Sequence, residues 1–161
     1  MGISSLRTKL IAQARGLKRH WRLQVAALCY RDGPNGVEVL LITSRGTGRW
    51  VLPKGWMMRG KTAQEAAVQE AWEEAGVCQS TPSAQPIGHY DYDKWLKSGL
   101  PCPVRVSVFA LKVHKRRGTF PEADERRHQW MPPSDAADKV DEPQLKALLA
   151  QFPRQLSART G

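Results

Sequence analysis

Three glutamates near the middle of the chain have the spacing that brings carboxylates together on a helix. Glu70, Glu73 and Glu74 stand at i, i+3 and i+4, positions that share one helical face. Such like charges destabilise an isolated helix by about 0.2–0.5 kcal/mol per pair, a penalty that a bound divalent cation would reverse. Oxygen ligands suit Mg²⁺ or Mn²⁺, which bind carboxylates and substrate phosphates together. The spacing alone favours an ordinary exposed acidic face, because charged residues are usually exposed.

The helix that carries these glutamates has clear ends. Thr62 and Glu65 have the form of a capping box, which predicts a helix over residues 63–75. Gly76 should end it in a left-handed conformation. Small alanines continue the acidic face toward the N-terminus. The opposite side should pack on a sheet through an apolar stripe formed by Val68, Ala71, Trp72 and Ala75.

The rest of the chain predicts a sheet of short strands and two closing helices. Residues 23–30 and 37–44 are apolar runs on either side of a Gly- and Pro-rich turn, so they should form a hairpin. Ser134 and Asp141 are candidate caps of the closing helices, the second over residues 142–151. Irregular alternation of helices and strands predicts an α+β fold with a mixed sheet. Further strands are expected at residues 86–92, 104–113 and 127–131, a short apolar piece at residues 50–52, a loop at residues 80–85 and a basic turn at residues 115–118.

The length of 161 residues fits one domain. We expect a basic leader over residues 1–20, the folded domain over residues 21–153 and a short tail over residues 154–161. The leader has no acidic residue, and its apolar residues fall near helical spacing among basic ones. A basic surface helix is favoured there over a mitochondrial presequence.

Composition limits the partners and the compartment. A net charge of +10 favours anionic partners, which include polyphosphates, nucleic acid and membrane surfaces. No apolar run approaches the roughly 20 residues of a membrane span. Three cysteines without paired spacing argue against a disulfide framework or a zinc site, so we expect a reducing compartment and a cytoplasmic location.

The residues around the acidic helix resemble the Nudix box, a motif of fixed length. It begins with a glycine and ends with an Arg-Glu-aliphatic-any-Glu-Glu-any-Gly-aliphatic run. Agreement over a fixed length is a far stronger signal than a lone glycine motif. The positions in register are Gly55, Glu70, Ala71, Glu73, Glu74, Gly76 and Val77.

This resemblance implies an α/β/α sandwich and a hydrolase that cuts a diphosphate linkage with Mg²⁺, or alternatively Mn²⁺. By position, the metal ligands would be Glu70, Glu73, Glu74 and the backbone carbonyl of Gly55. The metal would bring a water to the phosphorus and polarise the phosphoryl oxygens. One of the three glutamates should act as the general base.

Two positions of the box depart from the family pattern. Lys61 stands where the first glutamate is expected, and Gln69 where the arginine is expected. In the family that arginine helps to orient a catalytic glutamate, which Gln69 can do only as a neutral hydrogen-bond donor. The carboxylates that would bind metal are intact, so we expect an active enzyme.

Beyond the box, the chain resembles the diphosphoinositol polyphosphate phosphohydrolase branch, through segments at residues 22–30, 39–45, 49–55 and 126–130. That branch surrounds the substrate phosphates with cations, and arginine binds phosphate bidentately. Related enzymes also cleave dinucleoside polyphosphates, whose bases need a stacking surface that Trp50, Trp56, Tyr90, Tyr92 and Trp95 could supply. Lys54 and Arg127 are added to the binding set because they flank the expected cleft. The full substrate-binding set is Arg22, Ser44, Arg45, Lys54, Arg105 and Arg127.

Two other functions stay open. The departures at Lys61 and Gln69 are compatible with a module that binds anionic ligands without cleaving them. The basic leader and the net charge are compatible with an RNA 5′-end pyrophosphohydrolase, although no RNA-binding motif is visible. The expected partner is a polyphosphorylated small molecule, with nucleic acid as the weaker alternative and no membrane span. A monomer and a homodimer are equally compatible with the sequence.

Overall fold

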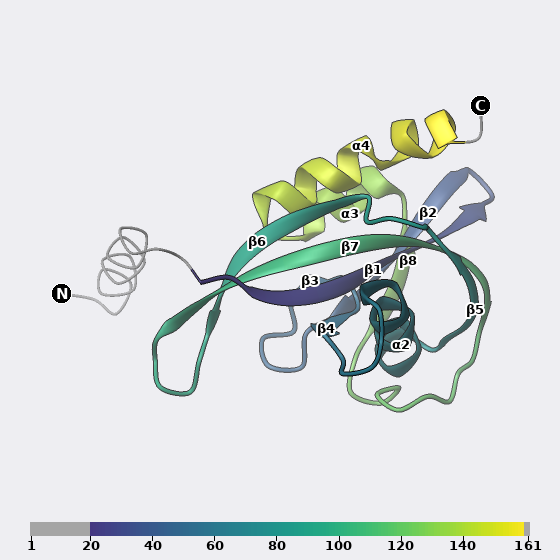
Figure 1. Ribbon diagram of the computed structural model, residues 1–161. Helices are drawn as coiled ribbons and strands as arrows, with labels where there is room; N and C mark the ends of the chain where they lie inside the picture. The colour runs from purple at the N-terminus through teal and green to yellow at the C-terminus, as the bar shows by residue number, and fades with distance from the viewer. Residues whose placement is uncertain (1–19, 160–161) are drawn as a thin grey trace.

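The computed structural model describes residues 20–159. They form three layers, with an eight-stranded mixed sheet between helix α2 on one face and helices α3 and α4 on the other (Figure 1). This confirms the predicted α/β/α sandwich. The helices are α2 (Ala63–Ala75), α3 (Pro133–Lys139) and α4 (Pro143–Arg159). The strands are β1 (Arg22–Gly33), β2 (Gly36–Thr43), β3 (Trp50–Val51), β4 (Lys54–Trp56), β5 (Val77–Pro82), β6 (Gly88–Trp95), β7 (Pro101–Arg116) and β8 (His128–Met131).

Strands β1 and β7 form the centre of the sheet. They run parallel, in register from Arg22 opposite Val104 to Tyr30 opposite Lys112. Strand β2 joins β1 as the predicted antiparallel hairpin, and β5 and β6 both pair with β7. Short β4 also pairs with β1, which fixes Gly55 opposite Val25 at the base of the acidic helix.

The sheet separates two hydrophobic cores. Strand β1 is buried on both faces, which explains its unbroken apolar run. Its Ala26 and Leu28 pack toward α3 and α4, whereas Val25, Ala27 and Cys29 pack toward α2. No helix among residues 20–159 is long and apolar enough to cross a membrane.

Helix α2 has the predicted ends but a different buried face. The Thr62–Glu65 capping box is formed, and Gly76 ends the helix at φ 73°. The buried stripe consists of four alanines and two glutamates, rather than the predicted stripe with Val68 and Trp72. Trp72 is only half-buried and lies against Phe120, with ring centroids 6.4 Å apart. The buried side chains are Ala66, Ala67, Glu70, Ala71, Glu74 and Ala75.

Three other predictions on local structure were wrong. The expected loop at residues 80–85 begins inside β5, because the long β7 offers it a pairing edge. Ser134 is not the cap of α3, whose N-cap is Pro132 without a side-chain hydrogen bond. Helix α4 runs on to Arg159, past the expected end at residue 151. The predicted leader falls on residues 1–19 almost entirely and so lies outside the described residues.

Gly76 offers a test of how tightly the end of α2 is packed. A Cβ atom there would lie 2.5 Å from the Arg117 carbonyl oxygen and 2.5 Å from Phe120 Cδ1. Gly60 also has a positive φ, 77°, but faces open space. We expect Gly60→Ala to lower the free energy of unfolding by about 1–2 kcal/mol from backbone strain alone, and Gly76→Ala to lower it clearly further. Urea denaturation measures both free energies of unfolding. Equal losses for the two variants would mean that the residues around Gly76 make room for a Cβ atom at no cost.

Candidate active site

A cleft of about 750 Å³ opens beside the C-terminal half of α2. Its walls come from the segment after β2, from β4, from the end of β6 and from the segment before β8. All three glutamates of the acidic face line it, together with Gly55. The structure thus brings the four residues predicted to hold metal to one place. The other lining residues include Gln24, Ser44, Arg45, Arg49, Lys54, Trp56, Tyr92, Asp93, Lys94, Trp95, Glu122 and Arg126.

Close packing between α2 and β4 positions two of the glutamates. Glu70 and Glu74 are each only 8% exposed. Gly55 lies so close to Glu70 that a Cβ atom would overlap the carboxylate, so the absence of a side chain here lets Glu70 adopt this position. The backbone amide of Lys54 donates a hydrogen bond to Glu74 Oε2 at 3.0 Å. Strand β4 therefore determines where both carboxylates sit.

The end of α2 is held by bonds to its last carbonyl groups, which have no partner within the helix. The amide of Glu122 donates to the Glu73 carbonyl at 3.0 Å. His128 Nε2 lies 3.2 Å from the Glu74 carbonyl, and Arg116 Nε donates to the Ala75 carbonyl at 2.9 Å. These contacts fix the turn that carries Glu73 and Glu74.

The electrostatics of the cluster favour a bound cation. Burial, together with the neighbouring charges of Glu74, Glu73 and Glu122, raises the pKa of Glu70 from its ordinary 4.5 to about 7, although Arg126 opposes this effect. Burial also raises the pKa of Glu74, although Arg126 and the Lys54 amide oppose this effect. Carboxylates that are both buried and mutually repelled are stabilised by a positive ion.

The donor set fits a hard divalent metal. Carboxylates and a backbone carbonyl supply only oxygen, the ligand type of Mg²⁺. Within residues 20–159, however, no group of three or more His, Cys, Asp or Glu side chains is arranged to hold a metal ion. Glu74 is bonded to Lys54 and Arg126, and Glu73 to Gln69. The predicted metal site stays a prediction.

Arg126 is the main residue of the cleft that the sequence did not single out. Its guanidinium donates to Glu74 Oε1 at 3.0 Å and to the Thr43 carbonyl at 3.0 Å. It also lies 3.5 Å from the carboxylate of Glu122, another overlooked residue. The side chain is 7% exposed. The arginine pair at residues 126–127 is the signal in the sequence, and in the structure Arg126 rather than Arg127 lines the cleft.

The two departures from the box have different surroundings. Gln69 Nε2 donates to Glu73 Oε1 at 2.8 Å, so Gln69 acts as the neutral donor that its chemistry allows. Lys61 is exposed and precedes an intact capping box. Its charge therefore leaves the start of the helix undisturbed.

Half of the predicted phosphate-binding residues line the cleft. Ser44, Arg45 and Lys54 do so, and Arg45 Nη1 pairs with Glu122 at 3.0 Å. Burial lowers the pKa of Lys54. Arg49, which we had not selected, also lines the cleft and binds Glu142 at 2.7 Å.

The other three predicted residues do not line the cleft. The Arg105 guanidinium is bound by both oxygens of Asp91, at 2.8 and 2.9 Å. Arg127 lies over the Trp50 ring, 5.4 Å from its centroid. Arg22 lies over Trp56, which does line the cleft, at 4.3 Å from the ring centroid. Only Arg22 is therefore adjacent to the site.

Comparison with known proteins gives a consistent family. The NUDIX domain model matches residues 21–152. Nudix hydrolase 16, mitochondrial, of Arabidopsis thaliana is 29% identical over 121 residues, covering 71% of this chain and 64% of that protein. Diphosphoinositol polyphosphate phosphohydrolase 3-alpha of Homo sapiens is 37% identical over 57 residues, or 35% of each chain. The chain thus aligns with less than two thirds of the length of these relatives.

Solved structures share the fold. A binary complex of the C. elegans Ap4A hydrolase superposes with a TM-score of 0.64 at 23% identity, covering 85% of this chain and 98% of that one. The NUDIX domain of Shewanella oneidensis NrtR, complexed with ADP ribose, gives 0.65 at 15% identity, with 92% and 97% covered. At these identities the likeness establishes the fold alone.

The raised pKa of Glu70 predicts how stability changes with pH in metal-free protein. Between pH 4.5 and 7 the folded state binds a proton that the unfolded chain releases, so stability falls as pH rises through this range. We expect Glu70→Gln to lack this pH dependence. The difference in free energy of unfolding between wild type and Glu70→Gln should therefore change by roughly 3 kcal/mol between pH 4.5 and 8. Glu65→Gln is the control, because the pKa of Glu65 is lowered by its bonds to Thr62. The free energies of unfolding are measured by urea denaturation in the presence of chelator. If they change with pH in the same way for wild type and Glu70→Gln, the raised pKa is not that of Glu70.

Arg126 should matter far more to stability than its neighbour. Arg126→Met leaves the buried Glu74 carboxylate without its cation, and breaking a buried pair in this way costs about 3–5 kcal/mol. Arg127→Met removes only a contact with Trp50 and should cost less than about 1 kcal/mol. Denaturant unfolding at pH 8 measures the free energy of unfolding of both variants. Equal losses in the two variants would show that Arg126 contributes no more to stability than Arg127.

Proposed function

This chain belongs to the Nudix family, and we propose that it is a Mg²⁺-dependent hydrolase of a diphosphate linkage in a polyphosphorylated small molecule. One observation carries the proposal: buried carboxylates at one end of a cleft whose walls carry cationic side chains. Carboxylates suit a metal and cations suit phosphate, so the cleft is built for both parts of a metal-bound polyphosphate.

The three glutamates divide into two roles. Glu70 and Glu74 are buried against β4, and we assign them, with the Gly55 carbonyl, to holding the metal. When bound, Mg²⁺ supplies charge stabilisation and lowers the pKa of a water ligand. Glu73 is half-exposed and bonded to the neutral Gln69 rather than to a cation. It lines the cleft without being buried against β4, so we assign it the role of proton acceptor from the attacking water.

The substrate class follows from the cations and the relatives. Lys54 lines the same cleft as the glutamates and makes no ion pair with a carboxylate among the described residues, so its charge is available to substrate phosphates. The relatives include a diphosphoinositol polyphosphate phosphohydrolase, and the structural neighbours an Ap4A hydrolase. We therefore propose a diphosphoinositol polyphosphate or a dinucleoside polyphosphate as substrate.

A binding module is the second candidate. It is favoured by Gln69 in place of the box arginine and by the lack of a preformed three-residue metal group within residues 20–159. Such a module would hold an anionic ligand in the same cleft without turnover.

For the compartment we propose the cytoplasm. Cys29, Cys78 and Cys102 are all free thiols, which suits a reducing environment. Several relatives carry mitochondrial or chloroplastic in their names, which makes an organelle the alternative.

Substitution of the glutamates tests the activity. With Mg²⁺, wild type should release phosphate or nucleotide from diphosphoinositol or dinucleoside polyphosphates, and chelator should stop it. We expect Glu73→Gln or Glu74→Gln to lower kcat at least 100-fold, the upper contribution of a general base or metal ligand being about 10⁴-fold. Glu65→Gln places the same change on the same helix outside the cleft and retains the capping box, so it should keep full activity.

Two outcomes would count against the proposal. Wild-type activity in both Glu73→Gln and Glu74→Gln would refute the assignment of the site. A wild type that binds Mg²⁺ and ligand but cleaves nothing in the panel would establish the binding module instead.

A further inference from the structure

We propose that the end of the cleft around Trp56 is a phosphate subsite that selects a densely phosphorylated, non-nucleotide substrate over a dinucleoside polyphosphate. We call this end the aromatic corner and define it by Arg22, Lys54, Trp56, Tyr92 and Lys94. The inference rests on the proposed function, and Trp56 and Lys94 are the residues that it adds to the binding set.

Most cations near the cleft are already paired. Arg126 is bound to Glu74 and Glu122, and Arg45 lies 3.0 Å from the same Glu122 carboxylate. Arg49 is bound to Glu142 at 2.7 Å. Their charges are balanced by protein carboxylates, so they add little net attraction for a substrate anion.

The cations of the aromatic corner are held differently. Arg22 and Lys94 lie over the Trp56 ring, 4.3 and 4.9 Å from its centroid, and Lys54 Nζ lies 5.3 Å from the centroid of Tyr92. None of the three makes an ion pair with a carboxylate among the described residues. Asp93 lines the same cleft, so the corner is not free of negative charge, but the three cations that define it are held by aromatic rings.

An aromatic ring restrains a cation without neutralising it. The attraction comes from the quadrupole of the ring, so the full positive charge remains available to a ligand. Restraint of these long side chains also reduces the conformational entropy that they would lose on binding. The corner is thus a preorganised site for anionic oxygens, which both guanidinium and ammonium groups bind strongly.

The same contacts disfavour a nucleobase. Trp56 lines the cleft together with Tyr92 and Trp95, and a base that stacks on Trp56 meets two cations that already lie over its ring. A neutral base would have to displace them and would leave their charges unpaired. A ligand with phosphates on a compact ring would instead add counter-charges without displacing any contact.

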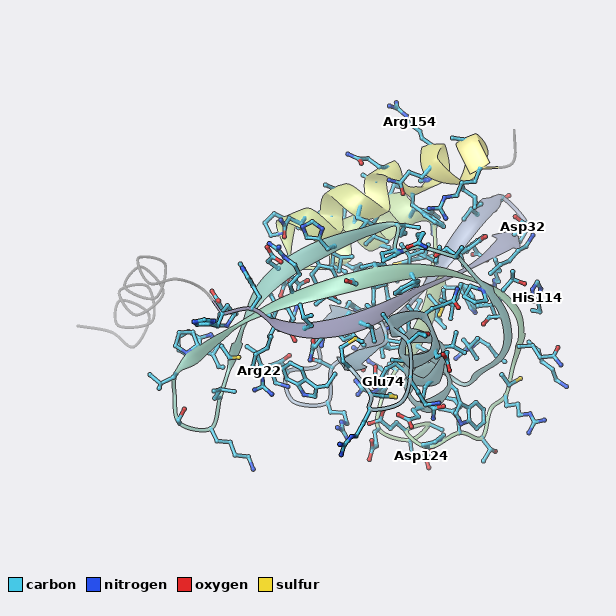
Figure 2. The ribbon with its side chains drawn as sticks, viewed as in Figure 1. Arg22, Asp32, Glu74, His114, Asp124 and Arg154 are labelled. Atoms are coloured by element: carbon cyan, nitrogen blue, oxygen red, sulfur yellow. The ribbon has the colours of Figure 1, made fainter. Side chains whose placement is uncertain are left out.

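Lys54 connects the corner to the carboxylate cluster. Its backbone amide donates to Glu74 Oε2, while its ammonium group reaches Tyr92. In Figure 2, Glu74 and Arg22 both lie on the side of the sheet that α2 covers, at separate points along it. Because the glutamates and four residues of the corner line one cleft, a single polyphosphorylated substrate can contact both.

Binding tests the subsite without depending on turnover. Inositol hexakisphosphate, which has no diphosphate linkage, is titrated into metal-free protein by calorimetry. We expect Lys94→Gln to weaken its binding roughly tenfold, since hydrogen bonds to charged groups are among the stronger ones. Lys97→Gln changes an exposed lysine that does not line the cleft, three residues further along the chain, and should bind as wild type does. Equal binding by all three proteins, or no binding by wild type, would overturn the subsite.

Kinetics test the selectivity. With a diphosphoinositol pentakisphosphate, Lys94→Gln should raise KM several-fold and leave kcat within about twofold, and raised salt should have the same effect by screening. With diadenosine pentaphosphate, Lys94→Gln should change little. If Trp56→Leu raises KM for the diadenosine compound and Lys94→Gln affects neither substrate, the corner stacks a base and the inference is wrong. Hexakisphosphate binding that depends on Lys94, in a wild type without hydrolysis, would refute the proposed function but not the subsite.

Discussion

The site depends on keeping one carboxylate charged in a place where water is nearly excluded. Glu74 achieves this with a hydrogen bond from the Lys54 amide to one oxygen and the Arg126 guanidinium against the other. Removing Arg126 would leave the buried charge without a cation, which is far more destabilising than losing an exposed ion pair. Strand β4, helix α2 and the segment before β8 must therefore come together for any of them to be stable there.

This requirement explains the unusual buried face of α2. Four alanines pack on the sheet where larger apolar residues would normally be expected. Their small size lets the helix axis approach the sheet closely enough for glutamates on the same face to reach the backbone of β4. Gly55 allows the same close approach from strand β4, since any side chain there would occupy the position of the Glu70 carboxylate.

Local signals account for what could be predicted from the sequence. The capping box, the terminal Gly76 and the glutamate spacing all lie within one helix, so its ends and its acidic cluster could be read directly. The buried side of that helix, the pairing of β5 with β7 and the choice between Arg126 and Arg127 depend on contacts between distant segments. Neighbouring residues in an extended segment point to opposite sides, and the sequence does not tell which one faces inward. Arg105 was placed in the binding set by its resemblance to the phosphohydrolase branch, and the sequence does not show that Asp91 lies opposite it on the adjacent strand and binds it.

The same distinction governs how the basic charge of the chain should be interpreted. A net charge of +10 suggests broad affinity for anions, yet the arginines closest to the glutamates are committed to carboxylates. Attraction for a ligand comes from the cations left over after this internal pairing, and these gather where aromatic rings rather than acids hold them. Within one cleft, the cations paired with carboxylates thus stabilise the structure, whereas the cations held by aromatic rings remain available to bind a ligand. The first kind stabilises the buried Glu74 carboxylate, and the second gives the aromatic corner its preference for phosphate.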